Sequence, residues 1–214
     1  LLSGRRALLS TATQALQDQL FARDIPAVSR ALGLPVRVAL LKGRSSYVCV
    51  QRLEQARIGP GASLRRDPAI SLGLEEVQRW AAGSRSGDLA ELPGLDERSP
   101  LRPLISSTRA NCLGAACPRI AECHVNRARD EAQQADWVVI NHHLFFADWQ
   151  LREAGMPELL PEVDVMVFDE AHQLNPIGVA FLGMELGSGH LLGLARDLVT
   201  QGPRWARGQR PWEA

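Results

Sequence analysis

The fold is decided by residues 163–172, which read Val163-Asp-Val-Met-Val-Phe-Asp-Glu-Ala-His172. The apolar run 165–168 has the composition of a buried strand, and two carboxylates, Asp169 and Glu170, follow it directly. Open α/β sheets bind their ligands at the carboxyl ends of parallel strands. The stretch therefore predicts a buried strand that carries acidic side chains to a ligand site.

Two interpretations are open for this acidic box, defined as residues 169–172. In nucleotide hydrolases an Asp at such a strand end holds magnesium on the phosphates, and the next acidic residue orients or deprotonates the attacking water. His172 would then link the γ-phosphate region to a moving element. Alternatively, Asp169 only caps the next helix and Glu170 favours its dipole. The full string favours the first interpretation, although the chain contains no G-x-x-x-x-G-K-[ST] phosphate loop.

Strands and helices are expected to alternate upstream of this stretch. The other apolar runs that predict strands are residues 7–10, 36–41 and 137–140. Hydroxyl caps at Thr11 and Thr13 precede a first helix, and a second helix is expected to start near Asp24 and to stop at Gly33. This alternation favours an α/β fold with a parallel sheet.

The segment from Gly43 to Gln134 is expected to be an insertion, with the strands before and after it in one sheet. Helices are predicted at 72–82 and from Pro118 to about Ala135, separated by a loop without an assignable pattern. The insertion is poor in aromatic residues. A metal site would therefore supply stability that its small core lacks.

Composition excludes several classes of protein. With 45% hydrophobic and 22% charged residues, the chain is not disordered as a whole. Lys plus Arg and Asp plus Glu both number 24, which excludes the basic footprint of a dedicated nucleic-acid domain. No apolar run approaches the roughly 18 to 20 residues of a membrane span. The first residues also lack the sequence of charged, apolar and small-residue regions that is typical of a signal peptide. We expect a cytoplasmic chain with no membrane partner.

Charge is nevertheless uneven along the chain. Residues 42–66 carry six basic side chains against one acidic side chain, a local net charge of +5. Arg44 and Arg52 would neutralise the phosphates of a nucleic acid there, with Tyr47 as a stacking platform. Alternatively, each arginine only lies on an ordinary solvated face of the protein and binds no nucleic acid.

Four cysteines, at positions 49, 112, 117 and 123, have the spacing C-x62-C-x4-C-x5-C. In a reducing compartment, cysteines with this spacing indicate metal binding or buried free thiols rather than disulfides. Zinc modules favour pairs separated by two to four residues, whereas the four thiolates of an iron–sulfur cubane approach from separate directions. An iron–sulfur cluster, zinc and inert thiols all stay open on spacing alone, with His124 as a possible competing ligand.

Taken together, these strings resemble the iron–sulfur superfamily 2 helicases of the XPD type, and most closely their bacterial DinG and YoaA branch. The resemblance covers nearly the whole chain and follows the family order. Besides the acidic box, the strings that carry it are Leu9-Ser-Thr-Ala-Thr-Gln14, Leu41-Lys-Gly-Arg-Ser-Ser-Tyr-Val-Cys49, Cys112-x4-Cys117-x5-Cys123 and Val138-Val-Ile-Asn-His-His-Leu144.

The resemblance implies a role for each of these strings. The residues expected to ligate a [4Fe-4S] cluster are Cys49, Cys112, Cys117 and Cys123. Asp169 would match the Mg²⁺ position, Glu170 the water-activating position and His172 the coupling position. The residues that fall on the motif contacting single-stranded DNA phosphates are Thr11, Thr13 and Gln14.

The resemblance also implies domains and a function. We expect the first motor domain, a partial RecA-like sheet, at 1–42 and 135–175, the cluster insertion at 43–134 and the start of an arch domain at 176–214. The complete protein would be an ATP-dependent 5′ to 3′ DNA helicase acting on single-stranded, forked or other structured DNA in repair or replication. Since the phosphate loop and the second motor domain are absent, this fragment alone is expected to be inactive. The alternative is a non-catalytic, metal-stabilised module that binds single-stranded nucleic acid.

Overall fold

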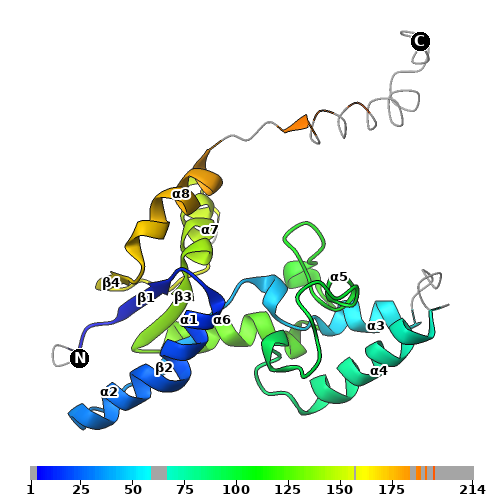
Figure 1. The fold of residues 1–214 in the computed structure, drawn as a ribbon, viewed down its shortest axis with the longest axis horizontal. Coiled ribbons are helices and arrows are strands. Elements are labelled where there is room, and N and C mark those ends of the chain that lie inside the picture. Colours follow the sequence, from blue (N-terminus) through cyan, green and yellow to red (C-terminus); the bar gives the residue numbers. More distant parts are fainter. Residues whose placement is uncertain are drawn as a thin grey trace.

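The centre of the molecule is a four-stranded parallel sheet (Figure 1). The structure is a computed structural model that describes residues 4–58, 67–156 and 158–183 and positions 187, 188, 191 and 195. The strands are β1 (Ala7–Thr11), β2 (Val38–Leu40), β3 (Trp137–Asn141) and β4 (Val165–Phe168). They are arranged in the order β2-β3-β1-β4, and every neighbouring pair is parallel. The predicted α/β fold with a parallel sheet is confirmed.

A helical connection leads from β1 to β2. It consists of α1 (Gln14–Gln19), a π-helical turn (Leu20–Asp24) and α2 (Ile25–Leu32). Thr13 caps α1 as predicted, because its Oγ1 accepts a hydrogen bond from the backbone N–H of Leu16 at 3.2 Å. The predicted helix start near Asp24 is confirmed, since α2 begins at Ile25, although Asp24 has helical dihedrals and makes no side-chain capping bond. Gly33 does end α2, with a left-handed φ of 63°.

The long segment between β2 and β3 is mainly helical. Its elements are η2 (Arg44–Ser46), α3 (Val50–Ile58), α4 (Pro68–Gly83), η4 (Leu89–Glu91), α5 (Arg102–Ile105), η5 (Gly114–Ala116), η6 (Ile120–Glu122) and α6 (His124–Gln134). Helix α4 begins earlier than predicted because Asp67 caps it, accepting from the N–H of Ala69 at 2.9 Å. Helix α6 begins later than predicted, because a 3-10 turn precedes Cys123.

The buried residues of this segment belong to two separate hydrophobic cores. One core lies within the segment and joins α3, α4 and α5, which Figure 1 shows on the side of the molecule away from the strands. Its buried members are Val48, Leu53, Ile70, Leu74, Val77, Leu89 and Ile105. The other core belongs to the sheet and includes Val125, Ala128 and Ala132 of α6. Helix α6 therefore packs on the sheet, whereas α3 to α5 form a body of their own.

Arg6, the residue before β1, holds the carboxyl end of α6 in place. Its guanidinium donates hydrogen bonds to the carbonyl oxygens of Ala132, Gln133 and Ala135, at 3.3, 2.7 and 3.2 Å. The last carbonyls of a helix lack partners within the helix, and a cation there also complements the helix dipole. One side chain thus fixes α6 to the edge where the strands begin.

The two central strands differ from β4 in burial. Residues 138–141 of β3 are buried, as predicted. The predicted burial of β4 is wrong, since Val165, Met166 and Val167 are 38%, 52% and 49% exposed. Strand β4 lies at one edge of the sheet and pairs with β1, whereas the other edge strand, β2, packs against α6.

After β3 the chain forms α7 (His142–Glu153), and after β4 it forms η7 (Ala171–Gln173) and α8 (Leu174–Leu182). Helices α7 and α8 lie side by side (Figure 1). Among the helices that the structure describes, none has both the length and the apolar character needed to cross a membrane. The arch domain predicted over 176–214 lies for the most part outside the described residues.

Candidate functional site

The carboxyl ends of the strands bring distant strings of the sequence to one edge of the sheet. Thr11 of β1 pairs with Asn141 of β3, and Ser10 pairs with Phe168 of β4. The segments that follow these strands therefore leave the sheet next to one another. This edge is where open α/β sheets bind ligands.

A pocket of about 490 Å³ opens between the segments that follow β1, β2 and β3. The polar side chains in its lining are Thr13, Gln14, Ser45, Ser46, Asn141 and His143. Hydroxyl and amide groups of this kind bind the phosphate oxygens of nucleic acids by hydrogen bonds. Of the predicted DNA contacts, Thr13 and Gln14 lie here. Thr11 is fully buried, and its Oγ1 donates to the carbonyl of Thr13 at 3.1 Å.

The acidic box extends from the end of β4 and is exposed. The N–H of Asp169 donates to the carbonyl of Ser10 at 2.9 Å, which continues the β1–β4 ladder by one bond. Its carboxylate accepts from the N–H of Glu170 at 3.0 Å, and neither η7 nor α8 has a side-chain cap. The alternative in which Asp169 only caps the next helix therefore has no support.

Glu170 adopts a left-handed backbone conformation, with φ 51° and ψ 43°. It is the one non-glycine residue with positive φ in the part of the chain that the structure describes. Its Oε2 lies 3.2 Å from Nδ1 of His172, so the two side chains form a pair. Strained backbone of this kind is concentrated at active sites.

His142, which sequence reasoning did not single out, fixes the backbone of the acidic box. It is completely buried, with Nδ1 2.7 Å from Oγ of Ser10 and Nε2 2.9 Å from the carbonyl oxygen of Asp169. A carbonyl only accepts, so Nε2 carries the proton and Nδ1 accepts from the serine hydroxyl. Burial lowers the pKa of His142, which keeps the ring neutral in this arrangement. Its signal in the sequence was the Asn-His-His string after β3.

All four cysteines line a single cavity of about 350 Å³ between α3, α6 and the turns that precede α6. Each is partly buried and none forms a disulfide. Within the described residues, no three His, Cys, Asp or Glu side chains converge as they would around one metal ion. The cysteines thus share one cavity but stand apart from one another.

The same cavity is rich in arginine. Arg44, Arg52, Arg119 and Arg129 line it, whereas no Asp or Glu is found among its described lining residues. Burial lowers the pKa of Arg129, and the nearby charge of Arg44 lowers it further. The cavity therefore has the charge that suits an anionic occupant.

Two residues that the sequence suggested as binding residues, Tyr47 for base stacking and His124 as a metal ligand, are buried in the fold. Tyr47 is only 4% exposed and its hydroxyl accepts from the N–H of Lys42 at 3.0 Å, so its ring offers no face to a base. Burial raises the pKa of Tyr47 to about 12. His124 is also buried, and its ring packs against Gly87, where an added Cβ would lie 2.2 Å from it. It does not line the cysteine cavity.

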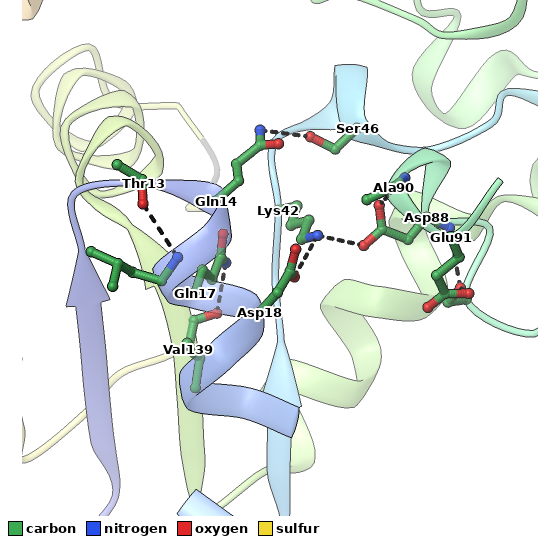
Figure 2. Close-up of polar contacts among 12 residues, drawn as sticks. Thr13, Gln14, Gln17, Asp18, Lys42, Ser46, Asp88, Ala90, Glu91 and Val139 are labelled. Carbon is green, nitrogen blue, oxygen red and sulfur yellow. Dashed lines mark hydrogen bonds and ion pairs between the residues drawn. The ribbon is translucent and has the colours of Figure 1, made fainter. Parts of the chain in front are cut away.

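Lys42, the only lysine of the chain, joins the sheet to the inserted segment (Figure 2). Its Nζ lies 2.6 Å from a carboxylate oxygen of Asp18 on α1 and 2.6 Å from one of Asp88 beside η4. The lysine side chain is 1% exposed and that of Asp88 is 7% exposed. Burial alone lowers the pKa of Lys42, but the two carboxylates outweigh it and the pKa is raised.

Gln17 adds a neutral contact beside this ion pair. Its Nε2 donates to the carbonyl of Leu41 at 2.8 Å and to that of Val139 at 3.2 Å, and the side chain is fully buried. Figure 2 shows the bond to Val139 and the neighbouring bond from Gln14 to Ser46. Helix α1 is thereby bonded to the strand ends of β2 and β3 and to the segment that leads to Cys49. We name this group of contacts around Lys42 the junction.

The fold and its edge define an α/β domain with a parallel sheet, as in part of a RecA-like motor domain. Over 198 residues, 92% of its length, the chain is 43% identical to a protein of Haemophilus influenzae named ATP-dependent DNA helicase YoaA. It is 44% identical over 197 residues to the Escherichia coli protein of the same name. Over 210 residues it is 37% identical to the ATP-dependent helicase DinG of Mycobacterium tuberculosis. No protein-family model matches the chain.

The chain therefore belongs to the DinG and YoaA branch that its motifs resemble. It spans 30% of the length of either YoaA protein and 31% of the DinG protein, so it corresponds to a segment of such a relative.

Replacing Lys42 by Met should destabilise the chain strongly. The variant leaves Asp88 buried without its partner, and breaking a buried ion pair costs about 3–5 kcal/mol. Urea unfolding followed by circular dichroism measures the loss. Adding Asp88→Asn to Lys42→Met removes the unpaired charge but keeps the cap of η4, so part of the stability should return. A single variant as stable as the original chain would show that the junction contributes nothing.

Replacing Glu170 by Gly should give a more stable protein than replacing it by Ala. Both variants lose the carboxylate, but only glycine adopts φ 51° without steric cost, a difference of about 1 kcal/mol. Urea unfolding midpoints compare the pair. At His172, where the backbone is not left-handed, the same two substitutions should have the opposite order. Equal stability of the two Glu170 variants would contradict the strained backbone.

Proposed function

We propose that the chain is the part of an ATP-dependent DNA helicase that carries its acidic box and a [4Fe-4S] cluster. The complete protein would couple ATP hydrolysis to 5′ to 3′ translocation on single-stranded DNA and to duplex unwinding in repair or replication. The observation that carries this proposal is the carboxyl edge of the sheet, which carries both the acidic box after β4 and the phosphate-compatible pocket after β1, β2 and β3. The names of the relatives support it.

In this proposal the acidic box is the hydrolytic centre. Asp169 would hold Mg²⁺ on the phosphates of ATP, and the metal would supply charge stabilisation there. Glu170 would accept a proton from the attacking water, and His172, 3.2 Å away, would sense the change of charge on it. His142 would keep the backbone of Asp169 in place through its bond to the carbonyl. The chain has no phosphate loop, so the remainder of the helicase must complete this site.

Single-stranded DNA is the proposed partner of the 490 Å³ pocket. Thr13 and Gln14 would donate to its phosphates, with Ser45 and Ser46 opposite them. Thr11 would act through its backbone and through the turn that its hydroxyl holds. Arg44 and Arg52 would contribute positive charge from the segment 42–66, and forked or otherwise structured DNA is the natural substrate of an unwinding enzyme. We do not assign a stacking role to Tyr47, because its ring is buried.

We propose that the cysteine cavity holds an iron–sulfur cluster and not a zinc ion. The ligands of one ion must converge on a point, whereas each thiolate of a cubane binds a different iron and stands apart from the others. A cavity lined by Cys49, Cys112, Cys117 and Cys123 and by four arginines suits that arrangement and its negative charge. The cluster would tie the turns before α6 to α3, with the boundaries 43–134 proposed for its domain.

A second candidate function is a non-catalytic module that binds single-stranded nucleic acid and is stabilised by a metal. The +5 segment favours it. The acidic box speaks against it, since a pure binding module has no use for Asp169, Glu170 and His172 at the edge of a sheet. Metal content separates the two: one zinc and no sulfide per chain would favour the binding module.

The 214-residue chain, given ATP, Mg²⁺ and single-stranded DNA, should release no phosphate above a Glu170→Gln control, because it has no phosphate loop of its own. A full-length protein that contains this segment should hydrolyse ATP, and Glu170→Gln in that protein should abolish turnover with little loss of DNA binding. Undiminished turnover in the full-length Glu170→Gln variant would refute the role given to the acidic box.

Anaerobically purified chain should contain about four irons and four acid-labile sulfides, since four thiolates hold one cubane. Cys117→Ser should lose most of this iron and loosen the body formed by α3 to α5, while the sheet stays formed. Ala116→Ser, an exposed neighbour outside the cavity lining, is the matched control and should keep its iron. Unchanged iron in Cys117→Ser would remove that residue from the ligand set.

A further inference from the structure

The 490 Å³ pocket at the carboxyl edge of the sheet also contains two aromatic rings. His143 of α7 and Phe181 of α8 line it together with Thr13 and Gln14. The centroids of the two rings lie 5.8 Å apart and their planes form an angle of 70°, so they are an edge-to-face pair. His143 is exposed and Phe181 is half-buried. Because both residues line the pocket and neither is fully buried, part of their aromatic surface opens into it.

The packing of α7 on α8 positions these rings (Figure 1). Phe181 also stacks on Phe146 of α7, with ring centroids 6.3 Å apart and planes at 23°. Gly178, one turn before Phe181, lets the helices approach closely, because an added Cβ there would lie only 3.0 Å from the ring of Phe146. The contact between the helices therefore places the Phe181 ring at the pocket before any ligand binds.

The pocket thus combines two kinds of group that suit the two parts of a nucleotide. Hydroxyl and amide groups such as those of Thr13 and Gln14 bind phosphate oxygens. Aromatic side chains hold the bases of single strands by stacking, without sequence preference, because every base has a π-face. Tyr47 is buried and offers no such face. His143 and Phe181 offer aromatic surface next to the groups that are compatible with phosphate.

We propose that a nucleobase of single-stranded DNA stacks on the pair formed by His143 and Phe181, while the neighbouring phosphate binds Thr13 and Gln14. The inference rests on the proposed function, which assigns single-stranded DNA to this pocket. It adds a base subsite to a site that otherwise contacts only the backbone of the strand. The strand is then held by two independent contributions, one from its phosphates and one from its bases.

Variants of the two rings separate stacking from hydrophobic packing. Phe181→Leu removes the ring and keeps an apolar side chain, whereas Phe181→Tyr keeps the ring. His143→Leu and His143→Phe form the same comparison on α7. Gln14→Met removes an amide that would bind phosphate. Trp149→Leu is the control for the loss of an exposed ring, because Trp149 lies on α7 outside the pocket lining and is 46% exposed.

The experiment is a fluorescence anisotropy titration of the 214-residue chain with two labelled single strands of about 12 nucleotides. One is oligothymidylate, and the other has the same backbone with abasic residues throughout. Phe181→Leu and His143→Leu should each weaken binding of oligothymidylate about tenfold, or about 1.4 kcal/mol, and leave binding of the abasic strand unchanged. Phe181→Tyr, His143→Phe and Trp149→Leu should bind both strands like the original chain. Gln14→Met should bind both strands more weakly.

Each outcome decides the inference. Leu variants that bind oligothymidylate as tightly as the original chain would overturn the base subsite, while the proposed DNA partner stands. Equal losses on both strands would assign the rings a structural role and overturn it as well. An original chain that binds the two strands equally would show that the bases contribute nothing. An original chain that binds neither strand would refute the proposed DNA partner itself, and the base subsite with it.

Discussion

The buried ion pair of Lys42 with Asp18 and Asp88 is the constraint on which the two halves of the structure depend. Its three members come from α1, from the chain just after β2 and from the turn before η4. A lysine buried in this way is tolerated because two carboxylates lie within hydrogen-bond distance, and the buried Asp88 requires the lysine in turn, whereas the side chain of Asp18 is 42% exposed. The strand end of β2, helix α1 and the turn before η4 are thereby fixed to one another.

This arrangement links the proposed sites without direct contact between them. Gln14 at the pocket and Asp18 at the junction lie on the same short helix, α1. The chain from Lys42 to Cys49 then leads directly from the junction to the first cysteine of the cavity. At the same carboxyl edge of the sheet, His142 connects β1, β3 and the acidic box through its two ring nitrogens.

Local signals in the sequence predicted much of this fold. Thr13 as a cap and Gly33 as a helix end act on residues within a turn, and both are confirmed. The burial of β4 could not be predicted, because composition describes a strand but not its place in the sheet. The junction and the contacts of His142 were missed for a related reason: their partners lie 24 to 132 residues away along the chain, and only the tertiary fold brings them together. The spacing of the cysteines did not decide which metal group they bind. Only the structure shows that Cys49 lines the same cavity as the other three cysteines.

The exposed strand β4 has a consequence for the behaviour of the chain in solution. Val165, Met166 and Val167 leave an apolar edge strand open among the described residues. An unpaired edge of this kind is a template onto which a strand of another molecule can add, and proteins usually protect such edges with charges, bulges or a covering element. Concentrated samples of the isolated chain will therefore tend to join edge to edge, so the strand that delivers the acidic box is also the surface through which self-association starts.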